Sequence, residues 1–564
     1  MRTVDDLQLV SARGRAGAVA AAHPLAVRAG IDALRQGGNA IDAAVATAFA
    51  LTVVDPPSTS LGGRGSALIY LAASRRLFTL DFNTVCPSGG QPGVYDVVPT
   101  REGEWWSVRD FANSIGHRAV AVPTNAAGFC AAARYGRLPL PALVERAAQI
   151  ADEGFAVPRV LEMSIAANAD RLGCNAASRA IYMPAGRPLR RGERLANPDL
   201  ARSLRLLGAE GATAFSAGAL GSAILADASA NGGLLAAADL RDYAVTEAAP
   251  AVTSYRGFDV AVTTRCTGGP TVLEALNILS GFDLPAAAAY EPRSVHLAIE
   301  ALKLAWADRF AYIADPAFVA VPFDGLLAPK YADERRALID EHRAAQAPAP
   351  GDPWRYSTMT PGHTANRRGP DSPDTTYCCA VDAEGNVVSM THTLCSAFGS
   401  GVTTPGTGIL LNNGMMWFDP RAGSPNSIAP GKTPLNNQNE TIVLRQGKPV
   451  LAIGSPGGRR LMTTIFVALS RIIDHDFSVS RALAAPRLHV EDREPTVFER
   501  DWQTDIVGGF ELLLALRQMG HSLTTLPITE RYISGPAHGI AIDPDTGDLE
   551  AAGDPRQPSA ADAI

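Results

Sequence analysis

The sequence has few cysteines, no surplus of positive charge and no long hydrophobic run. Its 564 residues contain seven cysteines, and so small and odd a count in a long chain excludes a disulfide framework as the basis of the fold. Lysine and arginine (50) are fewer than aspartate and glutamate (57) and are scattered along the chain, which argues against a nucleic-acid-binding surface. The longest nearly apolar run, residues 43–54, is too short to span a bilayer. We therefore expect neither nucleic acid nor a membrane among the partners.

The first part of the chain alternates predicted helices and strands around a large apolar content. Hydrophobic residues make up 46% of the sequence, enough for an extensive core. Gly37-Gly38 marks the end of one helix and Asn39 the cap of the next. The predicted elements are helices at 24–36, 39–54 and 295–313 and strands at 66–72 and 77–82. This order indicates helices layered on a sheet. No apolar signal segment follows Met1, which predicts a cytoplasmic location.

A proline-rich segment, residues 346–374, separates this part from the rest. It has few aliphatic residues, and a structureless loop of such length is uncommon inside a compact domain. One interpretation is a linker between domains. The other is a tail that moves away after the chain is cut at its end.

Strands return after this segment, as three predicted hairpins with polar, glycine-containing turns. Their strands are 377–381 with 387–394, 441–445 with 449–453, and 540–542 with 549–552, and helices are predicted at 461–473 and 510–519.

The junction Asp374-Thr375 is the most informative feature of the chain. A threonine pair opens the first hairpin directly after the proline-rich segment. If the chain cuts itself before Thr375, that residue gains a free α-amino group, which acts as general base for its own hydroxyl. An amine of pKa ~7.7–8 suits this work near neutral pH. Function would then depend on cleavage.

Three further pieces fit a nucleophilic threonine. Thr393 lies in the partner strand of the first hairpin, on the same face as Cys395. There its hydroxyl would hold the hydroxyl oxygen of Thr375 in place. Gly457 and Gly458 follow a strand and precede an amphipathic helix. Their amides would form an oxyanion hole at the helix N-terminus. Residues 406–415 are expected to form a pocket-lining strand.

These residues resemble the γ-glutamyltransferase family of N-terminal nucleophile hydrolases. The matching segments are 37–45, 61–63, 300–309, 375–376, 385–386, 405–413, 454–458 and 553–556. The resemblance implies an α+β fold, an αββα four-layer sandwich of two antiparallel sheets between helical layers. It implies cleavage between Asp374 and Thr375 into a large subunit (1–374) and a small subunit (375–564) that share one intertwined fold. Thr375 would be the nucleophile, Thr393 its hydroxyl partner, and Gly457 and Gly458 the oxyanion hole, with no metal or organic cofactor.

The departures from that family fall in the acyl pocket. Family members with glutamyl activity carry an arginine where this chain has Asn83, and an asparagine where it has Cys395. The segment that holds the glutamyl amino group there corresponds to residues 412–418 here, which lack its glutamine and its acidic residue. The serine pair of those members is replaced by Asn436 and Asn437. The predicted substrate-binding residues are Asn83, Cys395, Asn413, Gly414, Trp417, Asn436 and Asn437. Loss of the charged partners of a zwitterion weakens its binding, which indicates a non-glutamyl substrate. Residues 414–421 look similar to the oxamate amidohydrolase branch.

Three functions remain open from the sequence. The first is a self-processing amidohydrolase that hydrolyses a small amide or transfers its acyl group. The second is a genuine γ-glutamyltransferase or glutathione hydrolase, and the third an uncut binding protein. Association of two processed heterodimers into a homodimer is left open. A zinc site from Cys378, Cys379, His392 and Cys395 is disfavoured because neighbouring strand residues point to opposite faces.

Overall fold

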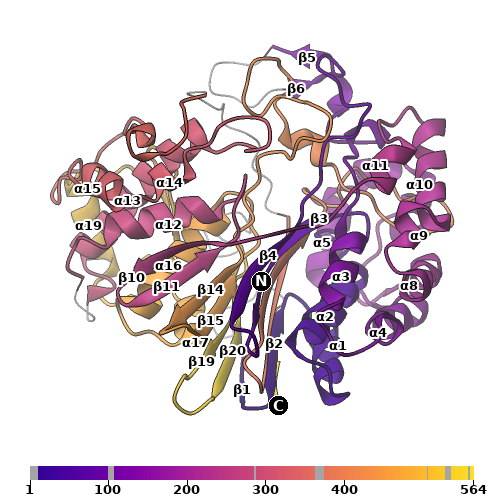
Figure 1. Cartoon of the computed structure of the whole chain (residues 1–564), viewed down its shortest axis with the longest axis horizontal. Coiled ribbons are helices and arrows are strands. Elements are labelled where there is room, and N and C mark those ends of the chain that lie inside the picture. Colours follow the sequence, from indigo (N-terminus) through magenta and orange to yellow (C-terminus); the bar gives the residue numbers. More distant parts are fainter. Residues whose placement is uncertain are drawn as a thin grey trace.

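Two seven-stranded antiparallel sheets pack face to face between two layers of helices (Figure 1). The computed structural model describes residues 10–99, 107–284, 288–362, 374–504, 506–526, 535–556 and 559–564. This is the predicted αββα sandwich. No helix in these ranges is both long and apolar enough to cross a membrane.

Sheet I carries the junction at Thr375 in its centre. Its strand order is β21-β2-β12-β13-β3-β4-β9. The strands are β21 (Ala560–Ala563), β2 (Gly17–Ala21), β12 (Thr376–Asp382), β13 (Val387–Thr393), β3 (Arg64–Leu71), β4 (Arg76–Phe82) and β9 (Thr246–Ala248). The hairpin β12–β13 is the predicted one, because alternation and a glycine-containing turn fix its register locally.

Sheet II has the order β1-β20-β19-β15-β14-β11-β10. Its strands are β1 (Val10–Gly14), β20 (Leu549–Gly553), β19 (His538–Ile542), β15 (Lys448–Gly454), β14 (Thr441–Arg445), β11 (Phe258–Val262) and β10 (Ala251–Tyr255). The other two predicted hairpins, β14–β15 and β19–β20, are confirmed here. Strands from before and after Asp374 lie side by side in both sheets, so the chain on either side of that residue forms one fold.

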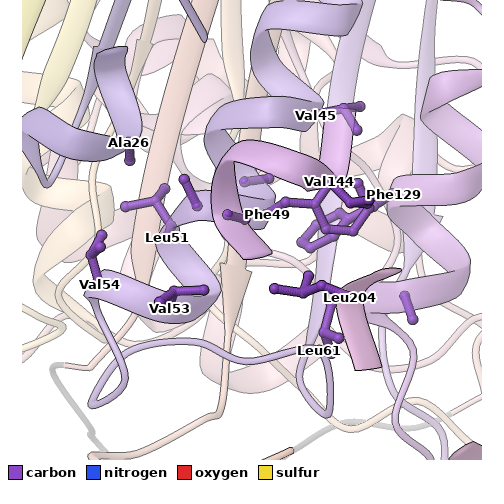
Figure 2. Close-up of a cluster of buried hydrophobic side chains, with 14 of the residues drawn as sticks. Ala26, Val45, Phe49, Leu51, Val53, Val54, Leu61, Phe129, Val144 and Leu204 are labelled. Carbon is purple, nitrogen blue, oxygen red and sulfur yellow. The ribbon is translucent and has the colours of Figure 1, made fainter. Parts of the chain in front are cut away.

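Helices on the outer face of sheet I enclose the largest apolar cluster. They are α1 (Pro24–Arg35), α2 (Ala40–Val54), α3 (Asn125–Ala133), α4 (Leu140–Glu153), α5 (Arg159–Ala167), α6 (Ala169–Gly173), α7 (Ala176–Tyr182), α8 (Pro198–Glu210), α9 (Thr213–Ser216), α10 (Ala219–Ala230) and α11 (Ala237–Arg241). Helix α2 is buried along its whole length, and Figure 2 shows Phe49 and Val45 among side chains from α3, α4 and α8. Asn39 caps α2 as predicted, and its backbone amide donates to Asp42.

The second helical layer covers sheet II and contains the predicted helix near 295–313. Its members are α12 (Gly269–Leu279), α13 (Pro292–Tyr312), α14 (Phe323–Leu326), α15 (Pro329–Arg336), α16 (Arg460–Ile473), α17 (Val479–Ala484), α18 (Asp501–Thr504) and α19 (Gly509–Gln518). The short strands outside the two sheets are β5 (Val97–Val98), β6 (Ser107–Val108), β7 (Phe155–Ala156), β8 (Arg194–Leu195), β16 (Leu488–His489), β17 (Thr496–Glu499) and β18 (Leu523–Leu526). A third apolar cluster fills the space between the sheets, which makes four layers.

The described part of the proline-rich segment is anchored to the second helical layer. The amide of Gly351 donates to Asp308 on α13 at 2.7 Å. The amide of Thr358 donates at 2.7 Å to Asp324 on α14. Residues 353–356 form a short 3₁₀ helix, η5 (Pro353–Tyr356). The segment is therefore not a free linker as far as residue 362; residues 363–373 lie outside the described ranges.

Candidate active site

Thr375 and Thr393 lie opposite each other at one end of sheet I. Strand β12 pairs with β13 so that Thr376 faces His392, and one further step brings Thr375 opposite Thr393. Their Oγ1 atoms are 3.2 Å apart. The predicted meeting of the two hydroxyls is confirmed, and it follows from the register of a tight hairpin.

Both hydroxyls surround the carbonyl group that precedes Thr375. Oγ1 of Thr393 donates a hydrogen bond to the carbonyl oxygen of Asp374 at 2.9 Å. Oγ1 of Thr375 lies 2.6 Å from the same oxygen. The amide of Cys395 donates to Oγ1 of Thr393 at 2.9 Å and fixes its direction. In this uncut chain the nucleophile therefore lies beside its own peptide carbonyl, with a second hydroxyl polarising that carbonyl.

Gly457 and Gly458 lie in a turn between β15 and α16. Helix α16 begins at Arg460, so both glycines lie in the turn just before the helix. Their φ angles are 127° and 62°, a region that favours glycine. Neither amide donates a hydrogen bond to another described residue. These free donors are what an oxyanion hole requires.

The glycine turn is held near the start of β12 by close packing. Gly454 ends β15, and a Cβ atom on it would lie 2.1 Å from the ring of Tyr377. Tyr377 is buried and follows Thr375 by two residues on β12. Sheet II thus approaches the strand that carries the nucleophile at this point.

Arg64, which the sequence did not single out, lies in the same row of residues. It pairs directly with Thr393 across β3 and β13. The Gly65–Phe82 pair between β3 and β4, extended by one residue, places Asn83 on its other side. The row across four neighbouring strands is therefore Thr375, Thr393, Arg64 and Asn83.

Side chains from both sheets converge on the Arg64 guanidinium. Its Nη1 donates to Oδ1 of Asn83 at 2.5 Å and to Oε1 of Gln438 at 3.1 Å. Its Nε donates to Sγ of Cys395 at 3.0 Å. Asn83 is itself held by Asp81, whose carboxylate accepts from its amide nitrogen at 2.9 Å. Two predicted pocket residues, Asn83 and Cys395, are thus joined by an arginine that the sequence analysis did not use.

Cys395 joins this group to Trp417. The two form a small buried apolar cluster with Met416. Burial raises the pKa of the Cys395 thiol, although Arg64 acts in the opposite direction, so the thiol is neutral at physiological pH. Its φ of 82° is strained for a residue other than glycine and costs about 1–3 kcal/mol, a kind of strain that gathers at functional sites.

Asn413 and Trp417 lie next to Cys395 in the fold, since the backbone amide of Asn413 donates to the carbonyl oxygen of Leu394 and Trp417 shares the apolar cluster. The Asn413 amide nitrogen donates to Oγ of Ser396 at 2.7 Å. Its Oδ1, like Nε1 of Trp417, is buried with no partner among the residues that the structure describes. Gly414 begins the 3₁₀ helix η6 (Gly414–Trp417) and packs tightly against Ala121. Residues 406–415 form isolated bridges and turns instead of the expected strand, because Gly406 and Gly408 have positive φ.

Asn436 and Asn437 contact a different arginine. Arg309 donates to the carbonyl oxygen of Asn436 at 2.5 Å and to Oδ1 of Asn437 at 2.9 Å. Burial lowers the pKa of Arg309 to about 9. The neighbour in the same segment that reaches the Thr393 row is Gln438. A substrate contact for Asn436 and Asn437 stays a prediction.

The buried carboxyl group of Glu440 lies beside Ser66, two residues along β3 from Arg64. Glu440 accepts hydrogen bonds from Ser66 at 2.8 Å and from Thr263 at 2.5 Å. Burial raises its pKa to about 7, although these hydroxyl groups act in the opposite direction. Glu440 therefore titrates near neutral pH, between the two sheets.

Cys378 and Cys379 point to opposite faces of sheet I, as the strand alternation predicted. Cys378 packs into the helical side of sheet I and Cys379 into the space between the sheets. His392 bonds Thr59 at 2.7 Å. The ligand atoms that do lie close together among the described residues belong to His296, Glu300 and His521. There Nδ1 of His296 and Nε2 of His521 are hydrogen-bonded to each other at 2.8 Å.

A threonine at the head of a central strand, beside the carbonyl that precedes it and within an αββα sandwich, defines an N-terminal nucleophile hydrolase. Residues 26–564 match the sequence model of the γ-glutamyltranspeptidase family. The chain belongs to this family.

Relatives and solved structures cover nearly the whole chain. An acylase ACY 1 proenzyme of Pseudomonas sp. (strain SE83) is 38% identical over 95% of this chain and 91% of its own length. A glutathione hydrolase proenzyme of Bacillus subtilis (strain 168) is 32% identical over 98% of this chain and 92% of its own. The crystal structure of a cephalosporin acylase from Bacillus halodurans superposes with a TM-score of 0.87 at 28% identity, covering 99% and 97% of the two chains.

Proposed function

We propose that this chain is a self-cleaving amidohydrolase in which Thr375 carries the acyl group of a small amide. The observation that carries the proposal is the position of Oγ1 of Thr375, 2.6 Å from the carbonyl oxygen of Asp374 and 3.2 Å from Oγ1 of Thr393. The names of the acylase and glutathione hydrolase relatives, both proenzymes, support it.

Self-cleavage uses the groups already in contact. Oγ1 of Thr375 attacks the carbonyl carbon of Asp374, and Thr393 stabilises the charge on the oxygen. The C–N bond breaks, the nitrogen of Thr375 takes up the proton, and an ester links the two residues. Water then hydrolyses the ester, leaving a carboxylate on Asp374 and a free amine on Thr375. The products are subunits 1–374 and 375–564.

Substrate turnover repeats this chemistry with the new amine as base. The amine takes the proton from Oγ1 of Thr375 as it attacks the substrate amide and passes that proton to the leaving amine. Gly457 and Gly458 stabilise the oxyanion. Water releases the acyl group; an amine acceptor in its place would make the reaction a transfer. The side chains that contact Arg64 are a thiol and two amides, with no carboxylate among them to hold a glutamyl ammonium group, which favours a non-glutamyl acyl group.

Denaturing electrophoresis and mass spectrometry test the proposal. Purified protein is expected to give two fragments that meet between Asp374 and Thr375, and Thr375→Ala a single uncut chain without amidase activity. Incubation with a substrate amide should add the acyl mass to the small subunit. A full-length chain that stays intact at neutral pH would support the uncut binding protein instead.

A glutathione hydrolase is the second candidate, because a glutathione hydrolase proenzyme is 32% identical over nearly the whole chain. A γ-glutamyl anilide distinguishes the two, since ordinary turnover of that substrate favours this candidate. A cytoplasmic location and a homodimer of processed heterodimers stay predictions.

A further inference from the structure

Arg64 is a buried cation without an anion. Its side chain is 3% exposed, and its three hydrogen bonds go to a thiol and two side-chain amides, those of Cys395, Asn83 and Gln438. No carboxylate of a described residue lies within ion-pair distance, and Nη2 donates to no described residue. A buried charge is costly unless it is paired with an opposite charge. Arg64 has no such partner among the described residues, and an anionic ligand would provide one.

Other buried arginines of this chain have a structural explanation that Arg64 lacks. Arg471 donates to two backbone carbonyls of the segment after α17 and joins that segment to α16. Arg309 likewise donates to the backbone carbonyls of Thr267 and Asn436. The Arg64 guanidinium donates to no backbone carbonyl of the residues that the structure describes. Its partners are side chains that surround the nucleophile's row.

Two acidic groups in this region, Asp81 and Glu440, are already engaged by other residues. Asp81 accepts from Asn83 and forms an ion pair with Arg265 at 2.9 Å. Glu440 is bonded to hydroxyl groups of both sheets. Neither is an ion-pair partner of Arg64, so the positive charge of its guanidinium remains available.

We propose that Arg64 binds a carboxylate on the acyl group of the substrate and is the specificity-determining residue of this pocket, with Asn83 and Gln438 as its positioning residues. Arg64 and Thr393 are direct neighbours across two strands, on one face of sheet I. Thr375 is one strand further, which puts its backbone on the order of 10 Å from that of Arg64. A span of this size suits a short acyl chain on Thr375 with a carboxylate at its far end.

A cleft borders this group of side chains at Asn83. Asn83 lines a cleft of about 400 Å³, together with Asp81, Tyr243 and Arg265. Asn83 contacts Arg64 directly. The inference rests on the proposed amidohydrolase function and specifies its acyl group: an amide whose acyl part is anionic, recognised by a planar guanidinium that binds a carboxylate through two hydrogen bonds.

Two anilides of equal chain length test this assignment. N-glutaryl-p-nitroanilide carries a terminal carboxylate, and N-pentanoyl-p-nitroanilide has a methyl group there. The processed wild-type enzyme is expected to prefer the glutaryl compound in kcat/KM. Arg64→Met should lower this preference at least about 30-fold, as expected for loss of one partner of a buried charge pair. Arg64→Lys should retain part of the preference, because lysine keeps the positive charge but lacks the two parallel N–H donors of a guanidinium.

The controls separate recognition from folding. Arg471→Met removes another buried guanidinium and should leave the preference unchanged. Self-cleavage of each variant on a denaturing gel reports an intact fold. If Arg64→Met does not fold, Asn83→Ala serves in its place, because loss of this acceptor should lower the same preference while a merely structural role would not.

The outcomes distinguish this inference from the proposed function. An enzyme that cuts itself and hydrolyses both anilides with the same preference in wild type and Arg64→Met overturns the role of Arg64 alone. Absence of a glutaryl preference in the wild type overturns it as well. A chain that neither cuts itself nor hydrolyses an anilide rejects the proposed function first.

Discussion

Oγ1 of Thr393 donates a hydrogen bond to the carbonyl oxygen of Asp374 at 2.9 Å, the carbonyl whose peptide bond must break. The same hydroxyl accepts a hydrogen bond from the amide of Cys395, so the hydroxyl proton of Thr393 points toward the carbonyl oxygen of Asp374. Thr393 is therefore placed to stabilise the oxyanion of self-cleavage, before any free amine exists at Thr375.

Thr393→Val keeps the shape of the side chain and removes this donor. Loss of one oxyanion donor typically costs about 10²–10³ in rate, so we expect self-cleavage to slow by that factor. Thr393→Ser keeps the hydroxyl and should cleave within about tenfold of the wild type. A time course of the full-length band on denaturing gels measures both rates. Equal self-cleavage rates for Thr393→Val and the wild type would show that the Thr393 hydroxyl takes no part in the reaction.

Gly454 is expected to tolerate no side chain. A Cβ atom there would meet the buried ring of Tyr377 at 2.1 Å, and overpacking of this kind costs about 1–3 kcal/mol. Gly454→Ala should lower the free energy of unfolding by that amount and disturb the turn that carries Gly457 and Gly458. Urea denaturation measures the first effect. Gly173→Ala is a control for the added methyl group, because its φ is not positive and nothing lies within 4 Å of a Cβ atom there.

The sequence was sufficient for features that depend on neighbouring residues. The hairpin that joins Thr375 to Thr393 has a local register, so their contact could be predicted from alternation and one turn. The cap of α2 at Asn39 and the end of α1 near Gly37 are local in the same sense. A family resemblance then supplied the order of the layers, which alternation does not determine.

The group of side chains around Arg64 could not be predicted in this way. Arg64 and Gln438 are 374 positions apart and meet because sheet I packs on sheet II. No periodicity records that contact. The one signal was an arginine among glycines at the start of a strand, where a buried charge is unusual.

Glu440 gives the stability of the protein a dependence on pH. Burial raises its pKa to about 7 from an ordinary value of 4.5. Below pH 4.5 the group is protonated in both folded and unfolded chains. Between pH 4.5 and 7 only the unfolded chain releases the proton, so stability falls as pH rises, by on the order of 3 kcal/mol in total, and then levels off.

Glu440→Gln should remove this dependence. We expect the free energy of unfolding to fall less between pH 5 and pH 8 in the variant than in its parent, by up to about 3 kcal/mol. Urea denaturation in a Thr375→Ala background keeps every sample as one uncut chain. Glu511→Gln, at an exposed position of α19, is the matched control. The same pH dependence with and without Glu440 would show that its carboxyl group ionises normally.

Lys303 joins the two sides of the cleavage point through buried charges. Its Nζ lies 2.9 Å from Glu300 on the same helix and 2.5 Å from Glu494 beyond the junction. It also donates to the carbonyl oxygen of Ala345 at 2.7 Å. Burial alone would raise the pKa of Glu494, but hydrogen bonds from His521 and Lys303 outweigh it and lower the pKa to about 2.

Lys303→Met leaves two buried carboxylates without their shared cation, a change that typically costs about 3–5 kcal/mol. We expect that loss in the free energy of unfolding of the Thr375→Ala chain, measured in urea. Adding Glu300→Gln and Glu494→Gln should recover much of it, because an uncharged cluster avoids the desolvation of unpaired ions. The exposed pair of Arg355 and Glu334 provides the contrast, since Arg355→Met should cost less than about 1 kcal/mol. A small effect of Lys303→Met would mean that water reaches the cluster. The contact between α13 and the segment around Glu494 would then depend on apolar packing instead of charge.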